Sequence, residues 1–292
     1  MTLMLVAMLI LPGIDAIAKW LSDAVSAGQV AWCRFLFQTL LMLPLFLRSR
    51  GPTPARALPL HALRGVLLAL ATLLFFAALK FLPLADAISI FFVEPLILTL
   101  LSAIFLAEPV GRRRVTAVAV GFAGALIVIR PSFAELGTPA LLPLGAALSF
   151  AVYLMLTRAL AQREQPERMQ FYAGLFGGIA MTVALLIGDA AGVPVLSYVR
   201  PDPSQWLLLA GLGVIATVGH LMVVHAFRHA AAGMLAPFQY VEIVGATILG
   251  LVFFGDFPDA TTWVGVSIIV ASGLYVFHRE ALIARGEKRV AD

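Results

Sequence analysis

The sequence predicts an all-α integral membrane protein with about ten transmembrane helices, arranged as two inverted five-helix repeats. Three observations predict this fold class. Hydrophobic residues make up 61% of the 292 residues and charged residues only 12%, whereas soluble domains carry about 25% charged residues. Apolar stretches of about 20 residues, the length that crosses a bilayer, recur along the chain. The second half of the chain also repeats a pattern of the first. A water-soluble globule is therefore excluded.

The predicted spans follow one another with connections too short to hold a soluble domain. They lie at 2–20, 28–47, 61–80, 84–106, 113–130, 140–161, 169–188, 204–227, 232–254 and 261–278. The first span begins at Met1 with neither a basic leader nor a small-residue cleavage pattern, so we expect a retained helix rather than a signal peptide. Any function must therefore reside in the helix bundle.

The basic residues predict how the chain is oriented. With the N-terminus inside, fourteen Lys and Arg residues fall in the even connections and the C-terminal tail, and only four in the odd connections. Cytoplasmic connections of membrane proteins carry such an excess of Lys and Arg. We therefore expect a multi-pass protein of the bacterial inner membrane with both termini in the cytoplasm.

Composition also limits the chemistry. The single cysteine, Cys33, excludes an intramolecular disulfide and a thiolate-rich metal site. His220 and His225 are five residues apart, which places them about 140° apart around a helix, so they do not form a metal-binding pair. The net charge of +4 comes from residues that punctuate apolar runs, which indicates membrane topology rather than nucleic-acid binding. We expect no cofactor and no metal.

An internal repeat is visible at an offset of 148 residues. Val93-Glu94 then aligns with Val241-Glu242, and Glu108 aligns with Asp256. With one added residue, Gly124 aligns with Gly273 and Arg130 with Arg279. Because each unit crosses the membrane five times, the second must start on the opposite side, as in the inverted repeats of secondary carriers. Chance similarity between two apolar segments is the competing explanation.

The segment LSAIFLAEPVGRRRVTAVAVGFAGALIVIRP resembles the end of the EamA repeat of the drug/metabolite transporter superfamily. LGLVFFGDFPDATTWVGVSIIVASGLYVFHRE resembles its second copy, with Asp256 in place of the usual Glu. WCRFLFQTLLMLPLFL resembles the second helix of the first repeat, which Arg34 would open. The resemblance implies a first repeat at 1–132, a second at 138–280 and a cytoplasmic tail at 281–292. It implies transport of small molecules without naming the cargo.

Two acidic residues lie near the middle of predicted spans. Glu94 and Glu242 each stand about ten residues into a span, where a carboxylate costs at least a few kcal/mol unless it faces a cavity or the bundle interior. Pro95 follows Glu94 and frees a backbone carbonyl, which suits a bent helix that lines a cavity. We expect the pair to bind a substrate ammonium or exchange a proton. The alternative is that each carboxyl is protonated or paired and only holds helices together.

Further side chains are candidates for the same pocket. In addition to the two glutamates, the predicted substrate-binding residues are Phe91, Phe238, Gln239, Tyr153 and His220. Tyr153 lies three residues after Phe150 and can stack with it on an aromatic or cationic cargo. His220 is a candidate proton carrier because imidazole titrates near neutral pH. Ordinary packing and a hydrogen-bonded structural histidine are the alternatives.

Other polar residues predict gates or structural contacts. Asp15 and Lys19 are four residues apart on one helix face, so we expect an ion pair between them near the outer end. Arg34 is expected to anchor the outer interface or attract a substrate carboxylate. Glu108 and Asp256 precede the next helix, and negative charge is favourable there. We therefore expect both acids to be structural or gate-locking.

These features favour a secondary carrier that works by alternating access. The chain has no GxxxxGK[ST] loop, so ATP does not drive transport directly. We expect an exporter of aromatic or hydrophobic amino acids. An importer of a cofactor-like molecule such as riboflavin or S-adenosylmethionine is the alternative within the carrier class. An intramembrane enzyme or a structural subunit is the alternative outside it, although no nucleophile with a nearby base is apparent. The expected partners are a small-molecule substrate and the lipid bilayer, and the expected state is a monomer.

Overall fold

The computed structural model describes residues 2–49, 57–105, 112–161, 164–229, 238 and 240–291. Over these residues the chain forms helices and turns, and no strand occurs among them. Within the described ranges, six helical segments are long and apolar enough to cross a membrane, and three shorter apolar helices accompany them. One further apolar crossing is divided into two helices. The predicted all-α membrane fold is confirmed.

The crossings follow the predicted order. The first half contains α1 (Thr2–Ile10) with α2 (Pro12–Leu21), α3 (Ala27–Arg48), α4 (Leu58–Leu79), α5 (Leu84–Phe91) with α6 (Glu94–Phe105), and α7 (Arg112–Leu136). The second half contains η2 (Thr138–Leu141) with α8 (Leu142–Ala161), α9 (Pro166–Ala190), η3 (Pro194–Leu196), α10 (Pro203–His229), α12 (Glu242–Leu249) with η4 (Gly250–Phe254), and α13 (Ala260–Ala291). Helix α13 continues through the segment that was expected to be a tail.

Turns precede Glu94 and Glu242 at corresponding positions. Helix α5 ends at Phe91 and α6 begins at Glu94, with a turn at 92–93 between them. A turn at 240–241 likewise precedes α12, which begins at Glu242. These positions differ by the 148-residue offset of the sequence repeat. Pro95 cannot donate a backbone hydrogen bond, which favours the break before α6. The bent, cavity-lining helix that was predicted there is observed.

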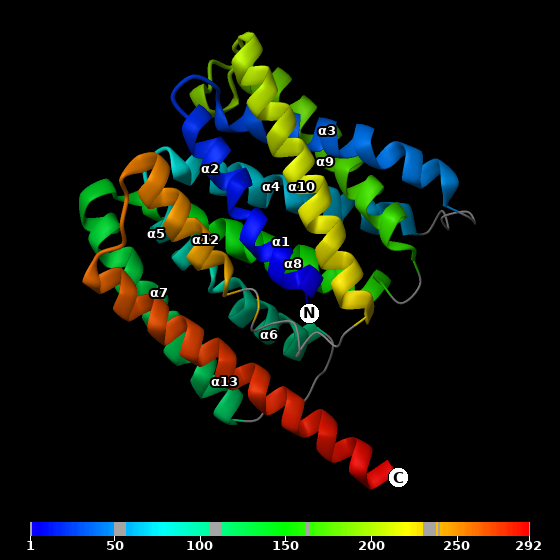
Figure 1. Cartoon of the computed structure of the whole chain (residues 1–292), viewed down its shortest axis with the longest axis vertical. Helices are drawn as coiled ribbons and strands as arrows, with labels where there is room; N and C mark the ends of the chain where they lie inside the picture. Colours follow the sequence, from blue (N-terminus) through cyan, green and yellow to red (C-terminus); the bar gives the residue numbers. More distant parts are fainter. Residues whose placement is uncertain are drawn as a thin grey trace.

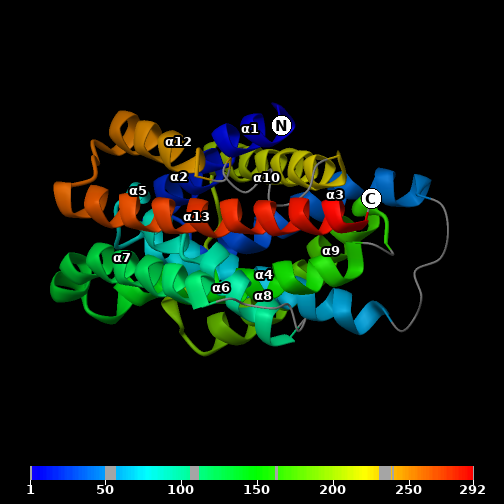
Figure 2. The ribbon, with the colours of Figure 1, turned by 90° about the horizontal axis from the view of Figure 1, so that it is seen from below.

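The two halves make matching contacts. Helix α7 packs along α13, and α3 packs along α9. The contact of α4 with α8 has its counterpart in α10 with α1, and that of α4 with α9 in α10 with α3. Figure 1 shows α13 running along α7 at one side of the bundle and continuing past it. Figure 2 shows α1, α10 and α12 in one layer and α4, α6 and α8 in another. The pattern is the one expected when two similar five-helix units pair.

Small residues bring neighbouring helices close together. A Cβ atom on Gly124 of α7 would lie 3.0 Å from the backbone oxygen of Gly265 on α13. A Cβ atom on Gly177 of α9 would lie 2.8 Å from the Phe35 ring of α3 and 3.2 Å from the backbone oxygen of Gly65 on α4. These glycines therefore allow close contact between helices within one chain.

Candidate functional site

A cavity of about 160 Å³ lies between the two layers of helices. It is large enough to hold several water molecules. Its lining comes from both halves of the chain. The first half contributes residues of α2, α4 and α6, and the second half contributes residues of α8, α10 and α12. The cavity therefore lies at the interface between the two five-helix units, where secondary carriers bind their cargo.

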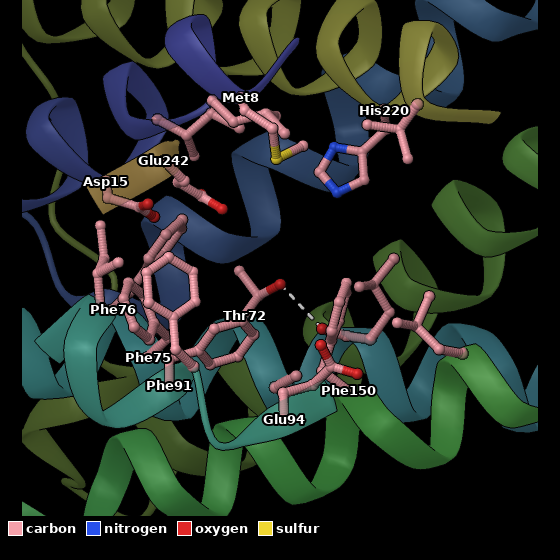
Figure 3. Close-up of a pocket in the computed structure, with 18 of the residues that line it drawn as sticks. Met8, Asp15, Thr72, Phe75, Phe76, Phe91, Glu94, Phe150, His220 and Glu242 are labelled. Carbon is pink, nitrogen blue, oxygen red and sulfur yellow. Dashed lines mark hydrogen bonds between the residues drawn. The ribbon is translucent and has the colours of Figure 1, made fainter. Parts of the chain in front are cut away.

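Three carboxyl groups face this cavity. Figure 3 shows Asp15 and Glu242 on one wall and Glu94 across the cavity beside Phe150. Asp15 and Glu94 both lie near enough to Glu242 for their negative charges to act on it. Glu94 is only 4% exposed, and its Oε1 has no hydrogen-bond partner. The cavity is therefore lined by three acids, one of which has an acceptor oxygen without a partner.

A single guanidinium group offsets part of this charge. Arg34 donates a hydrogen bond to the Thr72 hydroxyl, and its charge acts on Asp15. Another guanidinium nitrogen lies 3.4 Å from His220 Nε2. His220 Nδ1 lies 2.9 Å from the Ala216 carbonyl oxygen, so Nδ1 carries the proton and Nε2 is the acceptor toward Arg34. Asp15 and Arg34 thus bring opposite charges into one cavity, and His220 is neutral in this arrangement.

Aromatic rings form the remaining wall. The ring of Phe91 packs edge-on against Phe75 with a centroid distance of 5.3 Å, and against Phe150 at 5.6 Å. Phe76 and Phe92 line the cavity as well. Aromatic faces attract cations and stack on flat apolar groups. The wall thus suits a cargo that combines positive charge with an aromatic or apolar part.

Four of the predicted substrate-binding residues meet at the cavity. Glu94, Phe91, His220 and Glu242 all line it, although they come from four different helices. Phe238 is half-buried and packs against the hydrophobic core, away from the cavity lining. Gln239 lies outside the described residues, as does Glu108 among the predicted gate residues.

Tyr153, another predicted substrate-binding residue, is not among the residues that line the cavity. Tyr153 is buried and lies behind Phe150, with the two ring centroids 5.4 Å apart. The Arg64 guanidinium covers its ring at 5.1 Å. Residues three apart on a helix point in different directions by about 60°, so Phe150 reaches the cavity while Tyr153 packs between α8 and α4.

The predicted ion pair between Asp15 and Lys19 is wrong. Lys19 Nζ instead lies 2.7 Å from Asp256 Oδ2 and donates a second hydrogen bond to the Leu82 carbonyl at 3.0 Å. The connection after η4 brings Asp256 over the end of α2, whereas Asp15 lies one turn deeper and faces the cavity. Asp256 does not cap α13, because Asp259 accepts the hydrogen bond from the Thr262 backbone N–H at 2.6 Å.

The placement of Arg34 corrects another expectation. It is 6% exposed and lines the cavity, so it is not an anchor at the outer interface. The sequence could not show this depth, because the family resemblance placed the arginine at the opening of its span. The alternative that it attracts a substrate carboxylate is compatible with its position.

Sequence reasoning missed several lining residues. Met8, Thr72, Phe75 and Phe76 face the cavity, but none of them was singled out. Thr72 offers a weak signal, because it is an isolated hydroxyl in an apolar span. The apolar residues carry no signal of their own, since core packing and cavity lining use the same side chains.

Comparisons with known proteins agree with this architecture. The model of the EamA-like transporter family matches residues 1–130 and 138–277. A solved crystal structure has a similar fold, with a TM-score of 0.63, 20% sequence identity and coverage of 97% of both chains.

Curated relatives are transporters of different cargoes. The S-adenosylmethionine uptake transporter of Rickettsia bellii is 28% identical over 91% of this chain and 89% of that protein. The riboflavin transporter of Vibrio cholerae is 29% identical over 79% and 75% of the two chains. The pseudopaline exporter CntI of Pseudomonas aeruginosa is 30% identical over 88% of each. The family match covers nearly the whole sequence, and this chain therefore belongs to the EamA-like transporter family of the drug/metabolite transporter superfamily.

Proposed function

We propose that this protein is a secondary transporter for a small organic cation or zwitterion that carries an amino or sulfonium group beside an aromatic or apolar part. The observation that carries the proposal is the cavity with Asp15, Glu94 and Glu242 on its walls and phenylalanine rings around them. The proposed mechanism is alternating access between the two five-helix units, which are inverted relative to each other.

The charge balance of the cavity supports a positively charged cargo. The positive charge of Arg34 can compensate one of the three carboxylates. The carboxylate that its charge acts on is Asp15. Burying the other two carboxylates without a cation or a proton is costly. Cargo and protons therefore compete for Glu94 and Glu242, which gives a simple basis for exchanging cargo against protons.

The cavity can also hold a carboxylate. The Nε of Arg34 is buried without a hydrogen-bond partner, although the same guanidinium bonds Thr72. An α-amino acid group has an ammonium for the acidic wall and a carboxylate for Arg34. S-adenosylmethionine combines such a group with a sulfonium and an adenine ring, and the relative from Rickettsia bellii is named for its uptake.

Export of an aromatic or hydrophobic amino acid is the second candidate. Arg34, the acids and the Phe75, Phe91 and Phe150 rings suit such a cargo, and the CntI relative is named as an exporter. The excess of basic residues in the even connections supports a cytoplasmic location of both termini. The family and its relatives support transport rather than the enzyme alternative.

Counterflow into proteoliposomes tests the proposal and separates the candidates. Purified protein is reconstituted with S-adenosylmethionine, phenylalanine or riboflavin inside, and uptake of the labelled compound is followed at two pH values. We expect accelerated counterflow of a positively charged or zwitterionic compound, with inhibition by protons. Counterflow of neutral riboflavin alone, or of none of the three, contradicts the proposed cargo class.

A further inference from the structure

A second buried polar cluster lies apart from the cavity, between α3, α4, α8 and α9. We call it the basic cluster; its members are Gln38, His61, Arg64, Arg168 and Gln170, with exposed fractions of 0%, 0%, 1%, 9% and 2%. It lies near the start of α4 and the start of α9, and Phe46 near the end of α3 stacks on Phe171 there at 4.1 Å. None of its members lines the cavity.

The contacts that the structure describes for the two guanidinium groups of this cluster are with neutral groups. Arg64 donates to the Thr157 hydroxyl at 2.9 Å and lies over the Tyr153 ring. Arg168 lies over the Phe46 ring at 5.2 Å. Among the described residues, no carboxylate lies within 4.0 Å of either guanidinium. The adjacent acid Glu167 is directed to His225 on α10, at 4.0 Å. Buried charges are normally paired, so this surplus of positive charge requires an explanation.

The hydrogen-bond pattern shows what kind of group is missing. One Arg64 nitrogen lies 3.3 Å from His61 Nδ1, and because arginine only donates, Nδ1 accepts and His61 Nε2 carries the proton. That Nε2 has no acceptor, and neither do Arg168 Nε and Gln170 Nε2. Three buried donors thus lack acceptors, against one buried acceptor, Gln38 Oε1, that lacks a donor, and the charges of Arg64 and Arg168 both act on His61.

We propose that the basic cluster binds a phosphate-type oxyanion. Such an anion supplies several acceptor oxygens and the negative charge that two guanidinium groups require. The charge bias of the sequence places this end of the bundle on the cytoplasmic side, where basic pockets between transmembrane helices bind anionic headgroups. Arg168 is the most exposed member and forms the entry. The anion comes from a lipid headgroup or from free phosphate, and the two sources share this chemistry.

His61 and Arg64 also connect the cluster to the transport cavity. On α4, His61 is followed by Arg64, Leu68 and Thr72 at successive steps of three, four and four residues, and Leu68 and Thr72 line the cavity. Residues at this spacing share one helix face. An anion at His61 therefore fixes the same face of α4 that shapes the cavity, which gives it an influence on transport as well as on stability.

Thermal unfolding in nanodiscs tests the proposal. The purified chain is compared in phosphatidylcholine and in phosphatidylglycerol nanodiscs, and in phosphatidylcholine with added inorganic phosphate or chloride. We expect phosphatidylglycerol or phosphate, but not chloride, to raise the unfolding midpoint by roughly 5–10 °C, the size expected when a ligand is about a hundredfold above its Kd. A gain with the lipid alone identifies a headgroup, and a gain with phosphate alone identifies a soluble anion.

Variants then locate the effect. Arg168→Gln and His61→Gln should remove the gain, whereas Arg168→Lys should keep part of it because the charge remains. Arg48→Gln is the matched control, since Arg48 is an exposed arginine at the same end of α3. Native mass spectrometry of retained phosphatidylglycerol gives a second readout if a variant is unstable. Equal midpoints for the native chain under all four conditions, or a gain that survives in Arg168→Gln, would overturn the proposal.

Discussion

The segments α5–α6 and α12–η4 share a backbone plan but differ around their glutamates. In each, two turn residues precede a glutamate that begins the next helix. The turn residues Phe92 and Tyr240, which the sequence repeat aligns, contact each other with ring centroids 5.5 Å apart. Glu242, however, lies on the wall with Asp15, whereas Glu94 faces Phe150 with an unpartnered oxygen.

This difference shows that the repeated backbone and the neighbouring side chains, which are not repeated, determine different properties of the site. The backbone sets where the glutamates lie, and the side chains set the charge around them. The breaks place one carboxyl group from each half in the same cavity, as broken helices do in other secondary transporters. The neighbours then decide the electrostatics. Asp15 adds a second acid next to Glu242, with Arg34 offsetting part of its charge, so we expect this wall to be the stronger site for a cation. Glu94 is alone on its side, which suits a second contact to the cargo or a bound proton.

The largest expected effect comes from removing either glutamate. Glu242→Gln should lower counterflow of a cationic cargo about 10- to 100-fold, the range for losing one charge-assisted hydrogen bond. Glu94→Gln should lower it less, because Asp15 and Glu242 remain together. Counterflow rates normalised to inserted protein measure both. Glu135→Gln, a change at an exposed glutamate of α7, is the control and should transport normally. Native rates in both cavity variants contradict the site.

A substitution at Arg34 tests whether the cargo carries a carboxylate that binds to this residue. Arg34→Gln should weaken competition by a carboxylate-bearing cargo about tenfold, because a hydrogen bond to a charged partner is lost. A decarboxylated analogue with the same cation should compete nearly as well as before. The measurement is inhibition of counterflow by the two analogues. Equal losses for both analogues would show that Arg34 supports the structure without contacting the cargo.

A smaller effect is expected at the contact between the end of η4 and the residues before α5. Lys19 joins Asp256, after η4, to the Leu82 carbonyl, just before α5. A partly exposed ion pair contributes at most about 1 kcal/mol. Asp256→Asn should therefore raise the fraction of molecules that are open at this end of the bundle only a few-fold. Labelling of Thr72→Cys by an impermeant thiol reagent, with Cys33→Ser as background, reports the opening. Unchanged labelling argues against a gate at this contact.

The smallest effect on transport is expected where α7 packs on α13. Gly124→Val places a side chain against the Gly265 backbone and the Ile268 side chain. Overpacking of this kind costs about 1–3 kcal/mol of stability. We expect a lower unfolding temperature but a native counterflow rate per folded molecule, since neither helix contributes to the cavity lining. A large loss of rate in folded protein would mean that these helices move during transport.

Much of the fold and the centre of the site could be predicted from the sequence. Span length and hydropathy predict helices because the bilayer leaves the backbone few alternatives. The mid-span position of Glu94 and Glu242 predicts their cavity, because a carboxylate avoids lipid. The sequence did not predict correctly which side chain pairs with Lys19. Lys19 pairs with Asp256, 237 positions away, rather than with Asp15.

Long-range packing explains the remaining differences. The depth of Arg34 and the rotation of Tyr153 away from the cavity depend on how α3 and α8 meet α4. Span boundaries and helix periodicity do not contain this information. The basic cluster shows the same limit, because Arg64 and Arg168 are ordinary basic residues in the sequence. Only the structure shows that they are buried and that no carboxylate of the described residues pairs with them.

The most direct test is whether one bound cargo molecule contacts both glutamates. Cargo Kd values are measured for the native chain, Glu94→Gln, Glu242→Gln and the double variant in the same detergent. A shared site predicts that the two losses fail to add by about 0.5–3 kcal/mol, the coupling of residues that share a partner. Losses that add to within about 0.5 kcal/mol would mean that the two carboxyl groups act at separate places.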